Sequence, residues 1–159
     1  DQIVYASDVQ KNAPWGLARI SHRKKLTAKT KKRYIHDPKG GDGVTVFVID
    51  TGINTAHQEF QGRASWGKTI PYGDSDADGN GHGTHCAGTI GSRAFGTMSD
   101  VVAGVEFAVQ SHFALKAKQG GKYKGSVANM SLGGGKSRPL DTAVTNAVKA
   151  GLHFAVAAG

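Results

Sequence analysis

Two short strings contain residues that could carry out acid–base chemistry together. Asp50 ends the apolar run 44–49 and is followed by a Thr-Gly turn, and His82 lies within the small-residue string 80–88. In a serine hydrolase, a histidine takes the proton of the nucleophilic hydroxyl and an aspartate orients that histidine. Asp50 and His82 could fill these two roles, in the order acid and then base along the chain.

Each of the two residues also has a structural interpretation. A strand that ends in Asp-x-Gly is common as a plain turn, so Asp50 alone is as readily structural as functional. His82 alone is similarly ambiguous. A helix that begins at His82 would disfavour the imidazolium form, whereas a nearby aspartate would favour it. The combination of the two extended strings favours a catalytic pair.

The segments that must position these residues alternate between strand and helix patterns. β-branched and apolar runs predict buried strands, and small or amphipathic runs with Gly and Pro at their ends predict helices. Strands are predicted at 44–49, 127–132 and 153–158, and helices at 82–91, 99–118 with Ser99 as N-cap, and 139–150. This alternation predicts an α/β fold with a parallel sheet flanked by helices. Residues 92–98 show no strand pattern, so one central strand is expected to be missing.

Composition limits the classes of protein that this chain can belong to. Its 159 residues are 38% hydrophobic and 20% charged, which is typical of one globular domain or part of one. The net charge of +8 arises in residues 19–39, which hold nine Lys or Arg residues and one Asp. A solvated basic face is the favoured interpretation, because this segment has one aromatic residue, Tyr34, and no recognised nucleic-acid-binding motif. We therefore expect neither a nucleic-acid partner nor a membrane partner.

Cys86 is the single cysteine, so no disulfide can form within this chain. The first residue is Asp1 rather than Met, which suggests a processed or incomplete chain. Two metal sites are disfavoured. The acidic run 74–79 resembles the start of an EF-hand loop, but its twelfth position is His85 rather than Glu. His82, His85 and Cys86 lack the downstream ligand pair of a zinc site. No cofactor is expected, and weak calcium binding by the acidic run stays open.

Both strings resemble the first two signatures of the subtilisin-like serine proteases, Val-Ile-Asp50-Thr-Gly-Ile and Gly-His82-Gly-Thr-His-Cys86-Ala-Gly-Thr. The cysteine four residues after the histidine is similar to the proteinase K branch. Residues 129–134 resemble the substrate-binding strand of the family, and residues 155–159 resemble the wall of its primary specificity pocket. Residues 11–20 and 66–70 are similar to the fungal vacuolar members, the cerevisin group.

This resemblance implies a serine endopeptidase that cleaves peptide bonds through an acyl-enzyme. Asp50 would orient His82, and Cys86 would be a buried free thiol close to that base. The substrate would bind along two segments, Ser131, Leu132 and Gly133 in one, and Ala157, Ala158 and Gly159 in the other. Residues 10–159 would form the N-terminal portion of the peptidase domain, and residues 1–9 a propeptide remnant or flexible N-terminus. Peptides, proteins and a propeptide inhibitor are the implied partners, and the vacuole, or alternatively secretion, the implied location.

The chain also departs from the family pattern. The Gly-Thr-Ser-Met-Ala string of the nucleophile is absent, and the oxyanion asparagine would follow Gly159. We therefore expect the 159-residue chain to be inactive by itself. The alternative is a truncated or spliced product that acts in binding, for example as an allergen recognised by antibodies, because fungal vacuolar members of the family are a class of allergens.

Overall fold

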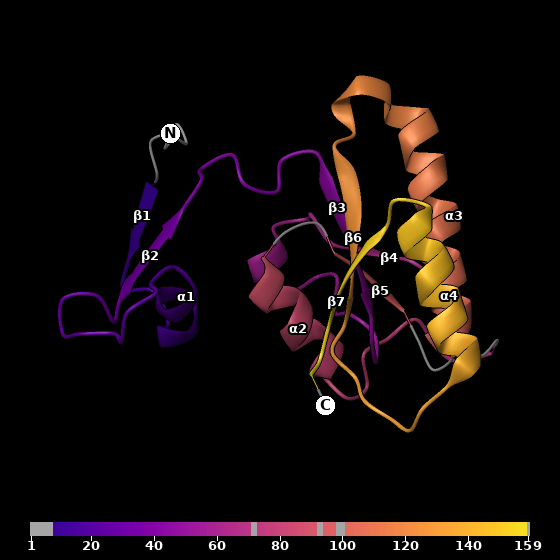
Figure 1. The fold of residues 1–159 in the computed structure, drawn as a ribbon, viewed down its shortest axis with the longest axis horizontal. Coiled ribbons are helices and arrows are strands. Elements are labelled where there is room, and N and C mark those ends of the chain that lie inside the picture. The colour runs from indigo at the N-terminus through magenta and orange to yellow at the C-terminus, as the bar shows by residue number, and fades with distance from the viewer. Residues whose placement is uncertain (1–7, 71–72, 92–93, 98–100, 159) are drawn as a thin grey trace. The chain divides into compact units, whose positions relative to one another are not determined.

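The computed structural model describes residues 8–70, 73–91, 94–97 and 101–158 (Figure 1). The chain divides into two compact units, Asp1–Asp42 and Gly43–Gly159. No helix in the described ranges combines the length and the apolar character that a membrane crossing needs.

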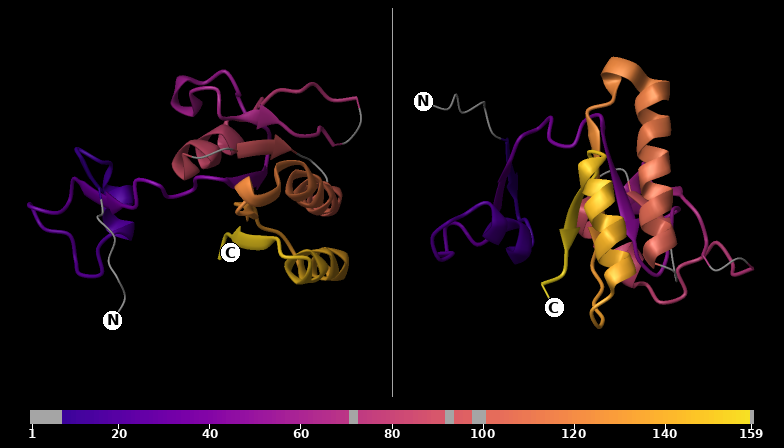
Figure 2. Two further views of the ribbon diagram at one scale, coloured as in Figure 1. Left: turned by 90° about the horizontal axis from the view of Figure 1, so that it is seen from above. Right: turned by 45° about the vertical axis from the view of Figure 1, so that its right-hand side comes forward.

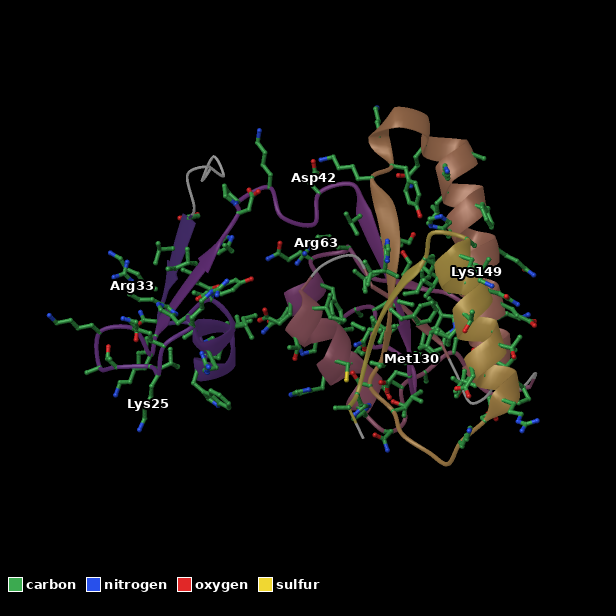
Figure 3. All side chains as sticks on the ribbon, viewed as in Figure 1. Lys25, Arg33, Asp42, Arg63, Met130 and Lys149 are labelled. Carbon is green, nitrogen blue, oxygen red and sulfur yellow. The ribbon has the colours of Figure 1, made fainter. Side chains whose placement is uncertain are left out.

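The first unit pairs two short strands around one helix. Strand β1 (Asp8–Lys11) runs antiparallel to β2 (Arg33–His36), and helix α1 (Trp15–Ile20) lies between them in the chain. These three elements were not predicted from the sequence. All nine basic residues of 19–39 are exposed, and the side chains of Lys25 and Arg33 extend away from the ribbon (Figure 3). This exposure is what a solvated basic face requires.

The second unit is built on a five-stranded parallel sheet. The spatial order is β4-β5-β3-β6-β7, and each adjacent pair is parallel. The strands are β3 (Val44–Ile49), β4 (Ser65–Trp66), β5 (Ala94–Thr97), β6 (Gly125–Met130) and β7 (His153–Val156). The remaining elements are α2 (His82–Ile90), α3 (Val101–Gln119), α4 (Arg138–Lys149) and the short 3₁₀ helices η1 (Gln58–Phe60) and η2 (Gly120–Lys122). The predicted α/β fold with a parallel sheet is confirmed.

Strand β3 separates two hydrophobic cores because successive side chains point to opposite faces of a sheet. Phe47 and Ile49 join the core that α3 and α4 cover. Val48 joins the second core, to which α2 contributes Ala87. Figure 2 shows the same layers, with α2 on one side of the sheet and α3 and α4 on the other. The central strand is thus fixed from both sides, and so is the residue that follows it.

The expectation that residues 92–98 contain no strand is wrong. Strand β5 occupies four of these positions and pairs with both β3 and β4. A segment of four residues with a central glycine is too short to show a period of two. Its extended form depends on backbone pairing with its neighbours rather than on intrinsic propensity. The predicted N-cap, Ser99, lies outside the described residues.

A buried polar network links α3 to β6. His112 and Ser126 are 5% and 3% exposed. The Tyr123 hydroxyl lies 2.8 Å from Nδ1 of His112 and contacts the Ser126 hydroxyl. Burial lowers the pKa of His112, and the charge of Lys116 lowers it further, so the neutral imidazole is favoured in the folded chain.

Replacing Tyr123 by Phe should lower the free energy of unfolding by about 1–3 kcal/mol, because two buried polar groups would lose a shared partner. Urea unfolding followed by circular dichroism would measure this. Tyr34→Phe removes the same atom from a ring that stacks on His36 and is the matched control. Equal effects of the two substitutions would contradict a special role for the network.

Candidate active site

The predicted site residues follow the ends of adjacent parallel strands. Asp50 follows β3, Ser131 follows β6 and Ala157 follows β7. The register pairs Val48 with Asn129, so the ends of β3 and β6 reach the same edge of the sheet. In open α/β sheets, ligands bind outside the carboxyl ends of the strands. The candidate site therefore lies where sheets of this class place their ligands.

Asp50 and His82 form a direct hydrogen bond at this edge. Oδ1 of Asp50 lies 2.7 Å from Nδ1 of His82 and also accepts from the backbone N–H of Thr51 at 2.7 Å. The aspartate side chain is 2% exposed, whereas the histidine side chain is 48% exposed. Oδ2 of Asp50 is buried without a hydrogen-bond partner among the described residues. A buried carboxylate thus orients an imidazole that solvent, or another reactant, can reach.

Helix α2 brings His82 to Asp50 through an unusually close backbone approach. His82 is the first helical residue, and Gly81, the N-cap, has a φ of 88° that favours glycine. A Cβ atom at Gly83 would overlap the carbonyl oxygen of Gly52 and lie 3.2 Å from Cβ of Asp50. Glycine at position 83 is therefore what allows the first turn of α2 to reach the turn after β3.

Asp50 favours the protonated form of the base. The hydrogen bond to Asp50 and its negative charge raise the pKa of His82, while slight burial lowers it and the charge of Asp78 raises it further. The helix N-terminus was expected to oppose protonation. Among these influences on the pKa of His82, the two carboxylates outweigh the effect of burial.

Cys86 lies one helical turn after His82 on α2. Its Sγ atom is 3.8 Å from Nδ1 and 3.9 Å from Nε2 of His82. The expected proximity to the base is thus found, but the thiol is only partly buried rather than fully buried. The reason is that α2 turns Gly83 and Ala87 toward the sheet, which leaves Cys86 at the border of that face. Burial raises the pKa of the Cys86 thiol, the Ser131 hydroxyl lowers it, and the charge of Asp50 raises it.

One group of donors in the described part of the chain has the composition of a metal site. Single ligand atoms of Asp50, His82 and Cys86 lie within 4.8 Å of one another. The zinc site disfavoured on sequence grounds had His85 in place of Asp50. In the acidic run, Asp76 accepts from Thr69, and Asp78 accepts from Thr51 and Thr84.

The predicted substrate-binding residues differ in their surroundings. The Ser131 hydroxyl donates to Oδ1 of Asn129 at 3.1 Å, Leu132 packs partly on the α3–α4 core, and Gly133 is exposed. Ala157 and Ala158 are exposed, and Ala157 N–H donates to the carbonyl of Met130 at 3.2 Å. Gly159 lies outside the described residues. Both segments begin at the carboxyl ends of their strands, on the same side of the sheet as Asp50.

Three residues that link the two strings through side-chain hydrogen bonds were not predicted from the sequence: Thr51, Asp78 and Thr84. One signal could have revealed them. A carboxylate shortly before a helix whose N-cap is glycine can take over the capping role.

The sequence of the chain is similar to those of known serine proteases. The profile of the subtilase family matches residues 41–159. The "Subtilisin-like serine protease Rho m 2.0101" of Rhodotorula mucilaginosa is 57% identical over 180 residues, covering 100% of this chain and 52% of the relative. "Alkaline protease 2" of Aspergillus fumigatus is 58% identical over 174 residues, covering 95% of this chain and 35% of the relative. The chain thus spans about a third to a half of these relatives.

The match to the Rhodotorula mucilaginosa protease spans 180 residues, which is longer than the 159 residues of the chain. That relative therefore has residues inside the matched region with no counterpart here. Among solved structures, a cold-adapted subtilisin-like serine proteinase superimposes with a TM-score of 0.75 at 37% identity. That match covers 93% of this chain and 56% of the proteinase. The profile match, the identities and the superposition agree, and the chain therefore belongs to the subtilase family.

Proposed function

We propose that this chain supplies the orienting acid and the general base of a serine endopeptidase. The observation that carries the proposal is the hydrogen bond between buried Asp50 and exposed His82. Membership of the family and the names of the relatives support it. The nucleophilic serine and the oxyanion asparagine are proposed to come from residues beyond the 159 present, because no matching string occurs among them.

In the proposed reaction, His82 takes the proton of the serine hydroxyl as its oxygen attacks the carbonyl carbon of the peptide bond. Asp50, bonded to Nδ1, keeps Nε2 as the proton acceptor and stabilises the imidazolium that forms. The imidazolium then gives its proton to the leaving amine, which leaves an acyl-enzyme. Water attacks the ester with His82 again as the base, which releases the carboxylic acid and restores the serine.

An extended peptide is the proposed substrate. Ser131 and Gly133 follow β6 at the edge that carries Asp50, and their backbone could pair with a substrate strand. Ala157, Ala158 and Gly159 would face the side chain next to the cleaved bond. The reaction as proposed uses protein side chains alone, and weak calcium binding by the acidic run 74–79 is a separate proposal. A propeptide inhibitor and a vacuolar location, or alternatively secretion, are proposed from the family resemblance.

Cys86 is not proposed as the nucleophile. Its thiol has a raised pKa, and the thiolate is the reactive form of cysteine. The position of Sγ beside both ring nitrogens of His82 suits a packing role next to the base.

The second candidate function is binding without catalysis. Several relatives carry names in the style of allergens, such as Rho m 2.0101 and Pen ch 18. A product that stops before the nucleophile could still present the exposed basic face of residues 19–39 to antibodies. A transcript that ends after Gly159 would favour this function, and one that continues to a Gly-Thr-Ser-Met-Ala string would favour the protease.

The 159-residue chain should show no amide hydrolysis, whereas the chain extended to the length of its relatives should cleave a peptide substrate. In that longer chain, His82→Ala should lower kcat by roughly four to six orders of magnitude, as single triad replacements do in subtilisin, a member of this family. His85→Ala, in the same helix, is the control. Turnover by the 159-residue chain that is lost in His82→Ala would contradict its expected inactivity.

The hydrogen-bonded pair of Asp50 and His82, here called the dyad, should also make the free energy of unfolding depend on pH. Because the folded chain raises the pKa of His82, its stabilising contribution is complete below the unfolded pKa of about 6.5. That contribution is lost as pH rises through the raised folded value. The difference in unfolding free energy between the native chain and His82→Gln should therefore shrink as pH rises through this window. A difference that grows with pH would be inconsistent with the dyad.

Cys86 should react slowly with iodoacetamide at neutral pH in the folded chain and faster after unfolding in urea, because unfolding removes the burial that raises its pKa. Mass spectrometry of quenched samples would give both rates. A small thiol such as free cysteine, treated in the same two buffers, corrects for the effect of urea on the reagent. Equal corrected rates would show that the fold does not restrain this thiol.

A further inference from the structure

Asp78 lies between the two strings that carry the dyad and accepts hydrogen bonds from both. Oδ1 accepts from the Thr51 hydroxyl at 2.9 Å and from the N–H groups of Gly81 and Asn80 at 2.8 and 3.3 Å. Oδ2 accepts from the N–H and the hydroxyl of Thr84 at 2.9 and 2.5 Å. Thr51 follows Asp50 directly, and Gly81 and Thr84 lie within two residues of His82, so the donors are close to both members of the dyad in the sequence.

Thr51 and Thr84 complete a reciprocal set of hydrogen bonds around Asp78, here called the clamp. The Thr51 hydroxyl, which donates to Asp78, accepts from the N–H of Gly83 at 3.0 Å. The Thr84 hydroxyl, which also donates to Asp78, accepts from the N–H of Asn54 at 2.9 Å. Each hydroxyl therefore gives its proton to the carboxylate and accepts an N–H from the opposite segment. The turn after β3 and the first turn of α2 are held in one register.

The clamp requires a carboxylate rather than another polar group. Every group that faces Asp78 in these contacts is a donor, and an amide would direct its own N–H₂ at some of them. Burial alone would raise the pKa of Asp78, but hydrogen bonds from Thr84, Gly81 and Thr51 outweigh it and lower the pKa to about 2. Five donors occupy the lone pairs of this carboxylate, which disfavours Asp78 as a calcium ligand.

The backbone around Asp78 leaves little room for adjustment. A Cβ atom at Gly52 would lie 2.9 Å from both the carbonyl oxygen of Ala77 and Cα of Asp78. Position 83 is restricted more strongly, because a Cβ atom there would overlap the carbonyl oxygen of Gly52. The segments that carry Asp50, Asp78 and His82 thus touch through their backbones, and small shifts in one must move another.

We propose that Asp78 is a positioning residue that fixes the hydrogen bond between Asp50 and His82 by clamping the turn after β3 to the start of α2. Asp78 makes no hydrogen bond to either member of the dyad and acts through Thr51, Gly81 and Thr84. The clamp is independent of the reaction, and its consequence for catalysis rests on the proposed function.

The test measures the titration of His82 by NMR in the full 159-residue chain, with imidazole shifts followed against pH. Asp78→Asn should lower the pKa of His82 toward its ordinary value, because the hydrogen bond to Asp50 loosens and because the direct effect of the Asp78 charge is lost. Asp76→Asn removes the same charge from the same loop and should leave the titration almost unchanged. Equal effects of the two variants would overturn the proposal.

A second pair of variants separates the clamp from the charge of Asp78. Thr84→Val keeps the shape and the charge but removes the hydroxyl, and it should lower the pKa of His82 as well. Thr84→Ser keeps the hydroxyl and should restore the native titration. If Thr84→Val titrates like the native chain while Asp78→Asn does not, Asp78 acts by charge alone and the proposal fails. These variants decide the question also where Asp78→Asn does not fold.

Activity provides a separate readout in the chain extended to the length of its relatives. Asp78→Asn should lower kcat by up to about 10²-fold with little change in KM, because the base is misplaced and the substrate segments are not. If the extended native chain cleaves no peptide, the proposed function fails, and the NMR titration still decides whether the clamp exists. A fall in kcat without any change in the His82 titration would overturn the positioning role.

Discussion

The double burial of β3 is the constraint on which the rest of the second unit depends. Its side chains alternate between two cores, one covered by α3 and α4 and the other by α2. Val48 and Ile49 are 0% and 1% exposed, so a slip in register would move each of them into the wrong core. The end of the strand is therefore held in one position, and so is Asp50, which follows it directly.

The second core then determines where the base can lie. Ala87 packs under β3, which directs the N-terminal end of α2 toward the strand end rather than away from it. Two glycines allow the backbones to touch, at positions 52 and 83, and Asp78 fastens the contact with hydrogen bonds. Packing of α2 against β3 thus brings Asp50 and His82 together, and the hydrogen bonds of Asp78 then fix the 2.7 Å separation between them.

The parts of the fold that the sequence predicted are those with strong local patterns. Val44–Ile49 has the same bounds in the structure as in the sequence analysis, and α2 ends at Ile90 because Gly91 adopts the left-handed conformation. Strand β5 was missed because pairing with β3, not its own composition, makes it a strand. The pairing of Asp50 with His82 followed from the two strings, but the clamp did not. Its residues are Thr and Asp, which are common in loops, and their hydrogen bonds depend on a contact between distant segments.

The sheet ends at β7, which is an edge in the described part of the chain and leaves Val156 59% exposed. An edge strand with an apolar side chain offers a template on which a second chain can add a strand. The unit that contains this edge has little net charge of its own, because the basic excess lies in residues 19–39. Electrostatic repulsion between copies of the chain must then come from the first unit. Colloidal stability would therefore fall as salt screens that charge, so low ionic strength should keep the chain in solution best.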